Sequence, residues 1–260
     1  MAKLKNSTGE ISAPLHEGGL GLRTYSSTSL HGQVVHELGK RIVSGAIAEG
    51  EVLPVETELG AEFDVSRTAL REGIKVLTAK GLLASRTRTG TRVRPRDEWN
   101  MLDPDVLAWR LETGKDENFI QDLYDFRMAV EPVAASLAAS RATDDDIADM
   151  KVAIEDMEAA GQDTDAFTEP DLHFHLLVFV SCKNDFLASL SALIETAVTF
   201  TFRMADVEID SAVVELHRNV FEAIRDRDSA RAHAGMVVLL NYARDRNEVV
   251  LAQIQAEKNQ

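Results

Sequence analysis

The sequence predicts a mainly α-helical protein made of a small N-terminal module and a larger, all-helical C-terminal module. The first observation is charge, because the 260-residue chain has a net charge of −15 that divides into +4 for residues 1–96 and −19 for residues 97–260. The second is hydrophobic periodicity, which is helical from about residue 104 onward, where Ala, Leu, Asp and Glu dominate. Apolar residues make up 45% of the chain, which is enough for a sizeable core and excludes global disorder.

The N-terminal module is predicted to contain three short helices and a β-hairpin. Residues 1–28 are rich in Gly, Ser and Thr without a lasting period, so we expect a mobile tail there. Helices are expected near 30–44, 55–63 and 66–80, and β-strands near 83–87 and 91–93. Ser66 is a suitable N-cap for the third helix, and Gly81 a suitable end. Three helices followed by a basic hairpin are typical of a winged helix-turn-helix domain, which we place at residues 29–96.

The rest of the chain is predicted to be helical throughout. Residues 97–112 are expected to form a linker and linker helix, and residues 113–258 an all-α bundle. The expected helices lie near 104–112, 117–140, 144–160, 165–182, 184–205, 211–226 and 228–255. The single cysteine, Cys182, excludes an internal disulfide, and the longest apolar run, Leu176–Val180, is too short to span a bilayer. We therefore expect a cytoplasmic protein without a membrane partner.

A basic block in the N-terminal module points to a polyanion partner. Residues 66–96 contain nine basic residues and one acid, Glu72. Arg67, Arg71 and Lys75 are spaced to share one face of the third helix, opposite an apolar face, as a recognition helix in the DNA major groove requires. The residues expected to contact double-stranded DNA are Ser66, Arg67, Thr68, Arg71, Lys75, Arg86, Arg88 and Gly90. The alternative is an ordinary solvated charged face.

The segment LPVETELGAEFDVSRTALREGIKVLTAKGLLASRTRTGTRVRP (53–95) resembles the winged-helix domain of bacterial GntR-type transcription regulators. The helical remainder is similar to the effector domain of their fatty-acid-regulator-like (FCD) branch. The segment RDEWNMLDPDVLAWRLE (96–112) resembles the linker of galactonate-responsive and other sugar-acid-sensing members. The resemblance implies a bacterial, nucleoid-associated regulator whose Arg67, Arg71 and wing residues around Gly90 contact an operator. Thr57 stands where the second helix often carries an Arg, so the family's operator consensus is not carried over to this chain.

Three polar positions of the helical module lie within apolar stripes. His175 shares a helix face with Asp171, His217 lies in a second stripe, and Arg127 lies in a third, with Glu131 one turn on. Buried charges need partners, so we expect these residues to meet. An Asp-x-x-x-His pair with a distant His is a common metal-binding arrangement. The spacing also allows structural roles: hydrogen-bonded core histidines, Asp171 as a first-turn acid after a proline, and an i,i+4 pair of Arg127 with Glu131.

The resemblance adds a role for each of these residues. EPDLHFHLL and ELHRNVFEAI match the ligand segments of metal-containing FCD domains, which implies Asp171, His175 and His217 as ligands of a divalent metal, zinc in the first place. YDFRMAVEP matches the segment whose Arg meets an effector carboxylate, here Arg127. Many relatives carry a further His where this chain has Leu239, so three protein ligands would leave positions for water or effector oxygens. The effector-binding candidates are Arg127, Arg203 and Asn241.

These observations predict a homodimeric repressor of a sugar-acid (galactonate-like hexonate) catabolic operon. A small hydroxycarboxylate effector would bind the helical module and release the protein from a palindromic operator. A metal ion and Arg127 would supply the positive charge that the acidic module otherwise lacks. An enzyme is not expected, because there is no second acid/base pair and no nucleophile motif, so no catalytic residue is assigned. The remaining alternative is a dimeric DNA-binding scaffold without a small-molecule effector, which would purify without stoichiometric metal.

Overall fold

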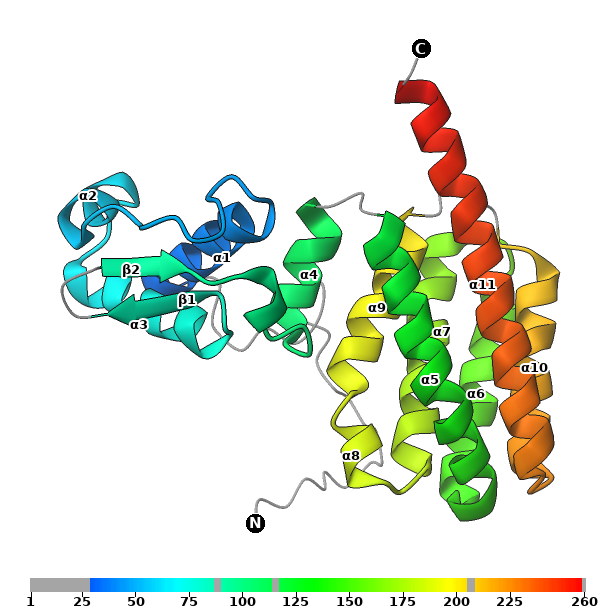
Figure 1. The fold of residues 1–260 in the computed structure, drawn as a ribbon. Coiled ribbons are helices and arrows are strands. Elements are labelled where there is room, and N and C mark those ends of the chain that lie inside the picture. Colours follow the sequence, from blue (N-terminus) through cyan, green and yellow to red (C-terminus); the bar gives the residue numbers. More distant parts are fainter. Residues whose placement is uncertain (1–28, 87–89, 114–116, 205–208, 259–260) are drawn as a thin grey trace.

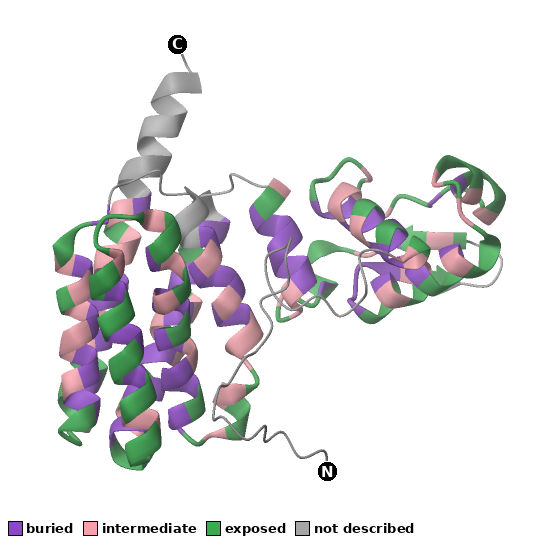
Figure 2. Cartoon of the chain, turned by 180° about the vertical axis from the view of Figure 1, so that it is seen from behind, coloured by how far each residue is buried: buried purple, intermediate pink, exposed green. Residues whose placement is uncertain are grey.

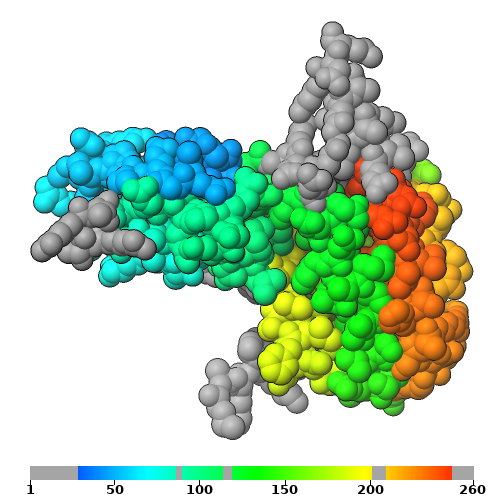
Figure 3. Space-filling model, in the orientation of Figure 1, coloured from blue at the N-terminus to red at the C-terminus, as the bar shows by residue number. Residues whose placement is uncertain are grey.

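The computed structural model describes residues 29–86, 90–113, 117–204 and 209–258; the side chains of 86, 117–118, 201–204 and 248–258 lie outside that description. The expected tail, residues 1–28, also lies outside the described residues. The chain forms two lobes that meet at one helix, α4 (Figures 1 and 3). The predicted fold class, a winged helix-turn-helix followed by an all-α bundle, is confirmed.

The N-terminal lobe consists of three helices and a two-stranded wing. Its elements are α1 (Leu30–Val43), α2 (Glu56–Glu62), α3 (Arg67–Ala79), β1 (Leu83–Arg86) and β2 (Gly90–Val93). The Ser29 and Ser66 hydroxyls cap α1 and α3 by accepting hydrogen bonds from backbone N–H groups of their first turns. The strands pair antiparallel from Leu83–Val93 to Arg86–Gly90. Gly90 opens β2 at φ +83°, a conformation that favours glycine.

The helix α4 (Pro104–Thr113) contributes to the cores of both lobes. Val106 and Trp109 pack with the apolar residues of α1 and α3, whereas Leu107 and Leu111 pack with those of α5 and α9. Seven consecutive residues, 105–111, are buried (Figure 2). A helix with no exposed face over two turns holds two cores together, so α4 is more than the linker helix that the sequence predicted.

The C-terminal lobe is a bundle whose helices lie mostly along one another (Figure 1). Its elements are α5 (Glu117–Arg141), α6 (Asp144–Ala160), α7 (Thr164–Ser181), α8 (Asp185–Ala188), α9 (Ser191–Met204), α10 (Ser211–Arg225) and α11 (Ser229–Lys258). The main pairings are α5 with α11, α10 with α11, and α6 with α7. Small residues of α5, such as Ala134 and Ala138, face aromatic residues of α7, including Phe174, in one core. No helix in the described segments is long and apolar enough to cross a lipid bilayer.

The single helix predicted over 184–205 is wrong, because the chain forms two helices there, α8 and α9. Asn184 caps α8 by accepting from the backbone N–H groups of Phe186 and Leu187. The hydroxyl of Ser189 then donates to the carbonyl of Phe186, and the hydroxyl of Ser191 to that of Ala188. Serine side chains that bond nearby carbonyls in this way compete with a continuous helix.

Candidate functional site

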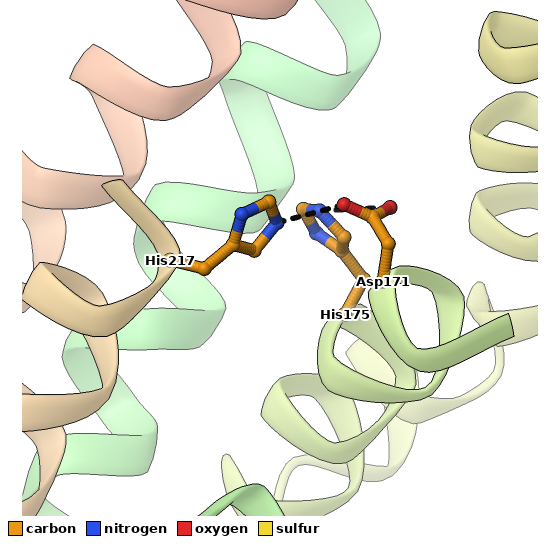
Figure 4. Close-up of side chains that lie close together, drawn as sticks. All are labelled: Asp171, His175 and His217. Carbon is orange, nitrogen blue, oxygen red and sulfur yellow. Dashed lines mark ion pairs between the residues drawn. The ribbon is translucent and has the colours of Figure 1, made fainter. Parts of the chain in front are cut away.

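Two helices bring Asp171, His175 and His217 together inside the C-terminal lobe (Figure 4). Asp171 and His175 come from successive turns of α7, and His217 faces them from α10. All three are buried, and one ligand atom from each lies within 4.8 Å of the other two. The alternative of Asp171 as a first-turn acid is wrong, because α7 begins at Thr164 with Asp163 as its N-cap.

The neighbours of the two histidines fix which ring nitrogen points into the site. His217 Nδ1 lies 2.7 Å from the Val213 carbonyl oxygen, which can only accept, so Nδ1 carries a proton and, in the neutral ring, Nε2 carries the lone pair. His175 Nδ1 lies 2.6 Å from Glu131 Oε2, in close contact but without a well-directed hydrogen bond. That carboxylate likewise favours the proton on Nδ1, which leaves Nε2 of His175 facing Asp171 at 3.9 Å.

This arrangement fits a metal ion. His217 Nε2 is buried and lies 2.9 Å from Asp171 Oδ1, yet it has no well-directed hydrogen bond. In the neutral ring this geometry places a lone pair beside a carboxylate oxygen, and either a proton on Nε2 or a metal ion between the two atoms relieves their repulsion. Two imidazole nitrogens and one carboxylate oxygen are ligands that divalent metals such as zinc accept.

A buried ion-pair network surrounds the metal-ligating groups. Burial by itself raises the pKa of Glu131, but the facing Arg127 and His175 outweigh it and hold that pKa at about 2. Burial also acts to raise the pKa of Asp171, and His217 brings it below its ordinary value. Burial lowers the pKa of Arg127, but Glu131 raises it above its usual range. Apart from the two histidines, one cation, Arg127, faces two anions, Glu131 and Asp171, so these three groups carry one net negative charge, which a divalent metal would reverse to one positive charge.

A cavity of about 50 Å³ opens beside these groups. The polar residues that line it are Arg127, Asp171, His175, His217, Tyr242, Arg246 and Asn247. Its apolar wall includes Leu239, the residue at the position where many relatives carry a further His. A volume of this size suits an ion with a few water-sized ligand atoms, so a larger effector requires the lining side chains to move.

The predicted effector contacts have different positions. Arg127 lines the cavity, and its Nε donates to Glu131 Oε1 at 2.5 Å, so the expected i,i+4 pair exists alongside the cavity contact. Asn241 is half-buried and does not line the cavity, although its neighbours Leu240 and Tyr242 do. Arg203 lies on α9, but its side chain is outside the described residues.

The α11 residues that line the cavity were not predicted, although Asn241 of the same helix was expected to bind the effector. Leu239, Ala243, Arg246 and Asn247 all line it from that helix. Their spacing of four, seven and eight residues marks one helix face, and this signal was available in the sequence. Asn247 is buried and donates its amide N–H to the Tyr124 hydroxyl.

The proposed DNA-binding residues lie on α3 and the wing. Ser66, Arg67, Thr68, Arg71 and Lys75 are exposed, while the opposite face of α3 is buried in the lobe. The side chain of Arg86 and all of Arg88 lie outside the described residues, so the structure places only Gly90 of the three wing residues in full.

A winged helix-turn-helix lobe joined to a helical effector lobe defines a DNA-binding transcription regulator. Residues 30–93 match the family described as bacterial regulatory proteins, gntR family, and residues 122–242 match the FCD domain. The chain therefore belongs to the GntR family of regulators, in its FCD branch, and is not an enzyme.

Among its relatives is the galactonate operon transcriptional repressor of Escherichia coli K12, which is 37% identical over 211 residues, 80% of this chain and 92% of that protein. The uncharacterised regulator YieP of the same organism is 35% identical over 214 residues, 80% of this chain and 90% of its own length. The solved structure of Lar from Listeria monocytogenes covers 87% of this chain and 99% of its own, with a TM-score of 0.57 and 17% identity, and shows the fold alone.

Proposed function

We propose that this regulator is a homodimeric repressor of a sugar-acid catabolic operon, released from its operator by a small hydroxycarboxylate. The convergence of Asp171, His175 and His217 on one point, with Arg127 lining the same cavity, is the observation that carries the proposal. The resemblance to a galactonate operon repressor supports the effector class, a galactonate-like hexonate.

The chemistry of the cavity supports an anionic, chelating effector. Three protein ligands would leave a divalent metal, zinc in the first place, with open positions for the carboxylate and hydroxyl oxygens of the effector. The Nε of Arg127 is engaged by Glu131, so its two terminal nitrogens remain to meet a carboxylate. Arg246 adds a second cationic group to the cavity lining. With a divalent metal bound, Arg127, Glu131 and Asp171 leave one net positive charge, to which Arg246 adds another, so an anionic carboxylate suits the site.

The two lobes have separate roles in this proposal. The N-terminal lobe, residues 29–96, binds a palindromic operator through Ser66, Arg67, Thr68, Arg71, Lys75 and the wing residues Arg86, Arg88 and Gly90. The bundle, residues 113–258, binds the effector and pairs two chains, and residues 97–112 join them. We place such a regulator in the bacterial cytoplasm, at the nucleoid.

Thermal unfolding of the purified protein against a panel of hexonates and other hydroxy acids tests the proposal. A ligand at 100 times its Kd stabilises the folded state by about 2.7 kcal/mol, a readily visible shift in Tm. We expect a shift with one acid that disappears when a chelator removes the metal. A shift that persists in the presence of the chelator would contradict a role for the metal. No shift with any acid would contradict a hydroxycarboxylate effector.

One observation favours the scaffold alternative as a second candidate. The charge of Arg127 is already balanced by Glu131, and the cavity is small, so the cluster is also consistent with a closed structural network. A scaffold would purify without stoichiometric metal, and no hydroxy acid would change its affinity for DNA. Elemental analysis of the protein as isolated separates the two.

A further inference from the structure

An ion pair joins the recognition helix to the helix before it. Arg71 Nε of α3 lies 3.0 and 2.9 Å from the two carboxylate oxygens of Glu56, the first residue of α2. Arg71 is 64% exposed and Glu56 is 40% exposed. The pair is thus on the surface, on the side of α3 that carries the exposed cations Arg67 and Lys75.

The stability of the lobe does not account for this pair, because exposed ion pairs contribute little to folding. An acid here also repels the phosphates of an approaching duplex. α2 has three acidic residues and no basic residue, and the residue after Glu56 is Thr57. Glu56 therefore has no cation on its own helix, and Arg71 is the partner that the structure gives it.

Glu56 occupies only the Nε edge of the Arg71 guanidinium. Glu56 engages Nε, so the two terminal nitrogens remain, and this fork matches the O6 and N7 acceptors of guanine. A guanidinium held at Nε is restricted in rotamer, which reduces the entropy lost on binding a base. The nearby carboxylate also makes a phosphate a poorer partner for Arg71 than a base edge.

We propose that Glu56 is a specificity-determining residue, which positions Arg71 to read a guanine and disfavours contact of Arg71 with the DNA backbone. This inference rests on the proposed DNA-binding face and is independent of the metal and the effector.

The test uses the full-length protein and a duplex that it selects from a random library. Kd is measured for the selected duplex, for a scrambled duplex and for single-guanine replacements, at several salt concentrations. The variants are Glu56→Gln, Arg71→Lys and the double variant. Glu62→Gln is the matched control, because it removes the same charge from the same helix at an exposed ion pair, with Arg41 of α1.

Glu56→Gln should lower the ratio of the affinity for the selected duplex to the affinity for the scrambled duplex by roughly tenfold, within the range of one bidentate base contact. Most of this loss should fall on replacement of one guanine. Binding of scrambled duplex should become more salt-dependent, by about one phosphate contact, because Arg71 is then free to reach the backbone. Arg71→Lys should lose the same guanine preference, and the double variant should lose little more than either single one.

Each other outcome contradicts a defined part of the account. If Arg71→Lys loses the guanine preference while Glu56→Gln behaves like Glu62→Gln, the role of Glu56 is wrong and the DNA-binding face stands. If Arg71→Lys changes neither affinity nor preference, the proposed DNA-binding face itself is wrong. Circular dichroism of each variant separates these results from misfolding. If Glu56→Gln is misfolded, Arg71→Lys decides. An Arg71→Lys variant that keeps its preference for every guanine would then overturn the inference.

Discussion

A single side chain, Glu131, contacts both Arg127, the proposed anion-binding residue, and His175, a proposed metal ligand. One of its oxygens lies 2.5 Å from Arg127 and the other 2.6 Å from His175, and the side chain is fully buried. The same carboxylate thus orients the group that would hold an anion and the group that would hold a metal. Spacing placed Glu131 beside Arg127, but its contact with His175 joins two helices and could not be found from a periodic pattern.

We expect Glu131→Gln to weaken zinc binding by about 10- to 100-fold, as the loss of groups that orient metal ligands does. In the same geometry the amide presents its oxygen to only one of Arg127 and His175 and its NH2 group to the other, so His175 is no longer held in one tautomer. Zinc titration against a competing chelator measures the change. Glu195→Gln is the control, because Glu195 is a partly buried glutamate of α9, its pKa raised by burial, that does not line the cavity. Equal zinc affinity in both variants would contradict this role.

Asp171→Asn should abolish stoichiometric metal binding while preserving side-chain volume. The neutral amide removes the only carboxylate among the three ligand residues, and the two histidines alone hold a divalent ion poorly. Elemental analysis after dialysis against zinc provides the readout, with Asp149→Asn, an exposed position of α6, as the control. Retention of one zinc per chain by Asp171→Asn would show that the metal lies elsewhere.

At the scale of elements, α6 begins with a reciprocal cap. The Thr143 hydroxyl accepts from the backbone N–H of Asp146, and the Asp146 carboxylate accepts from the backbone N–H of Thr143. Lys183 also pairs with Asp146 at 2.7 Å. The Thr-x-x-Asp spacing is legible in the sequence, whereas the Lys183 contact depends on the packing of α7 against α6.

Thr143→Ala should reduce the free energy of unfolding by about 0.5–2 kcal/mol, the usual cost of losing an N-cap.

Burial acts to raise the pKa of Asp146, but Lys183 and Thr143 lower it below its ordinary value of 3.8. Its charge therefore stabilises the folded state above about pH 4, and this contribution is lost as pH falls through the lowered pKa. Chemical denaturation of Asp146→Asn should differ from wild type at pH 7 and converge with it in acid. A gap that is constant with pH would contradict the assignment.

The contact between α1 and α4 depends on a glycine. A Cβ at Gly39 would lie 2.5 Å from Cζ3 of Trp109, whose indole N–H donates to His36 Nδ1 at 3.0 Å. Gly39→Ala should therefore destabilise the protein by about 1–3 kcal/mol, although alanine is the better helix former. Denaturation followed by tryptophan fluorescence measures the change. Gly235→Ala, where the nearest atom is a Val220 methyl carbon at 3.2 Å, should cost less. The reverse order would contradict this packing.

At the scale of the whole molecule, α4 links the DNA-binding lobe to the effector lobe. Lys80, at the end of α3, is buried between Asp103 at 2.9 Å and Asp105 at 2.5 Å, at the start of α4. The recognition helix is thus tied to α4, whose other face packs on α5 and α9. A change around the cavity therefore has a continuous packed route to α3 through α5 and α4.

The sequence predicted the two-lobe plan because charge and periodicity change sharply after residue 96. It also predicted the grouping of Asp171, His175 and His217, since inward-facing polar residues must meet in a bundle. It could not predict that α4 belongs to both cores, because a helix buried all round lacks a clear period. The break between α8 and α9 was not predicted, because the sequence does not show whether a serine hydroxyl faces solvent or donates to a nearby backbone carbonyl, as Ser189 and Ser191 do.

Control of DNA binding by the cavity is tested by fluorescence anisotropy of a labelled operator duplex, bound by the zinc-loaded protein and titrated with hexonates. We predict that one hydroxy acid raises the operator Kd by about 5- to 150-fold, the usual range of allosteric coupling. Chelation of the zinc should abolish that response. An operator Kd that no hydroxy acid changes, with zinc bound, would contradict the claim that this cavity controls DNA binding.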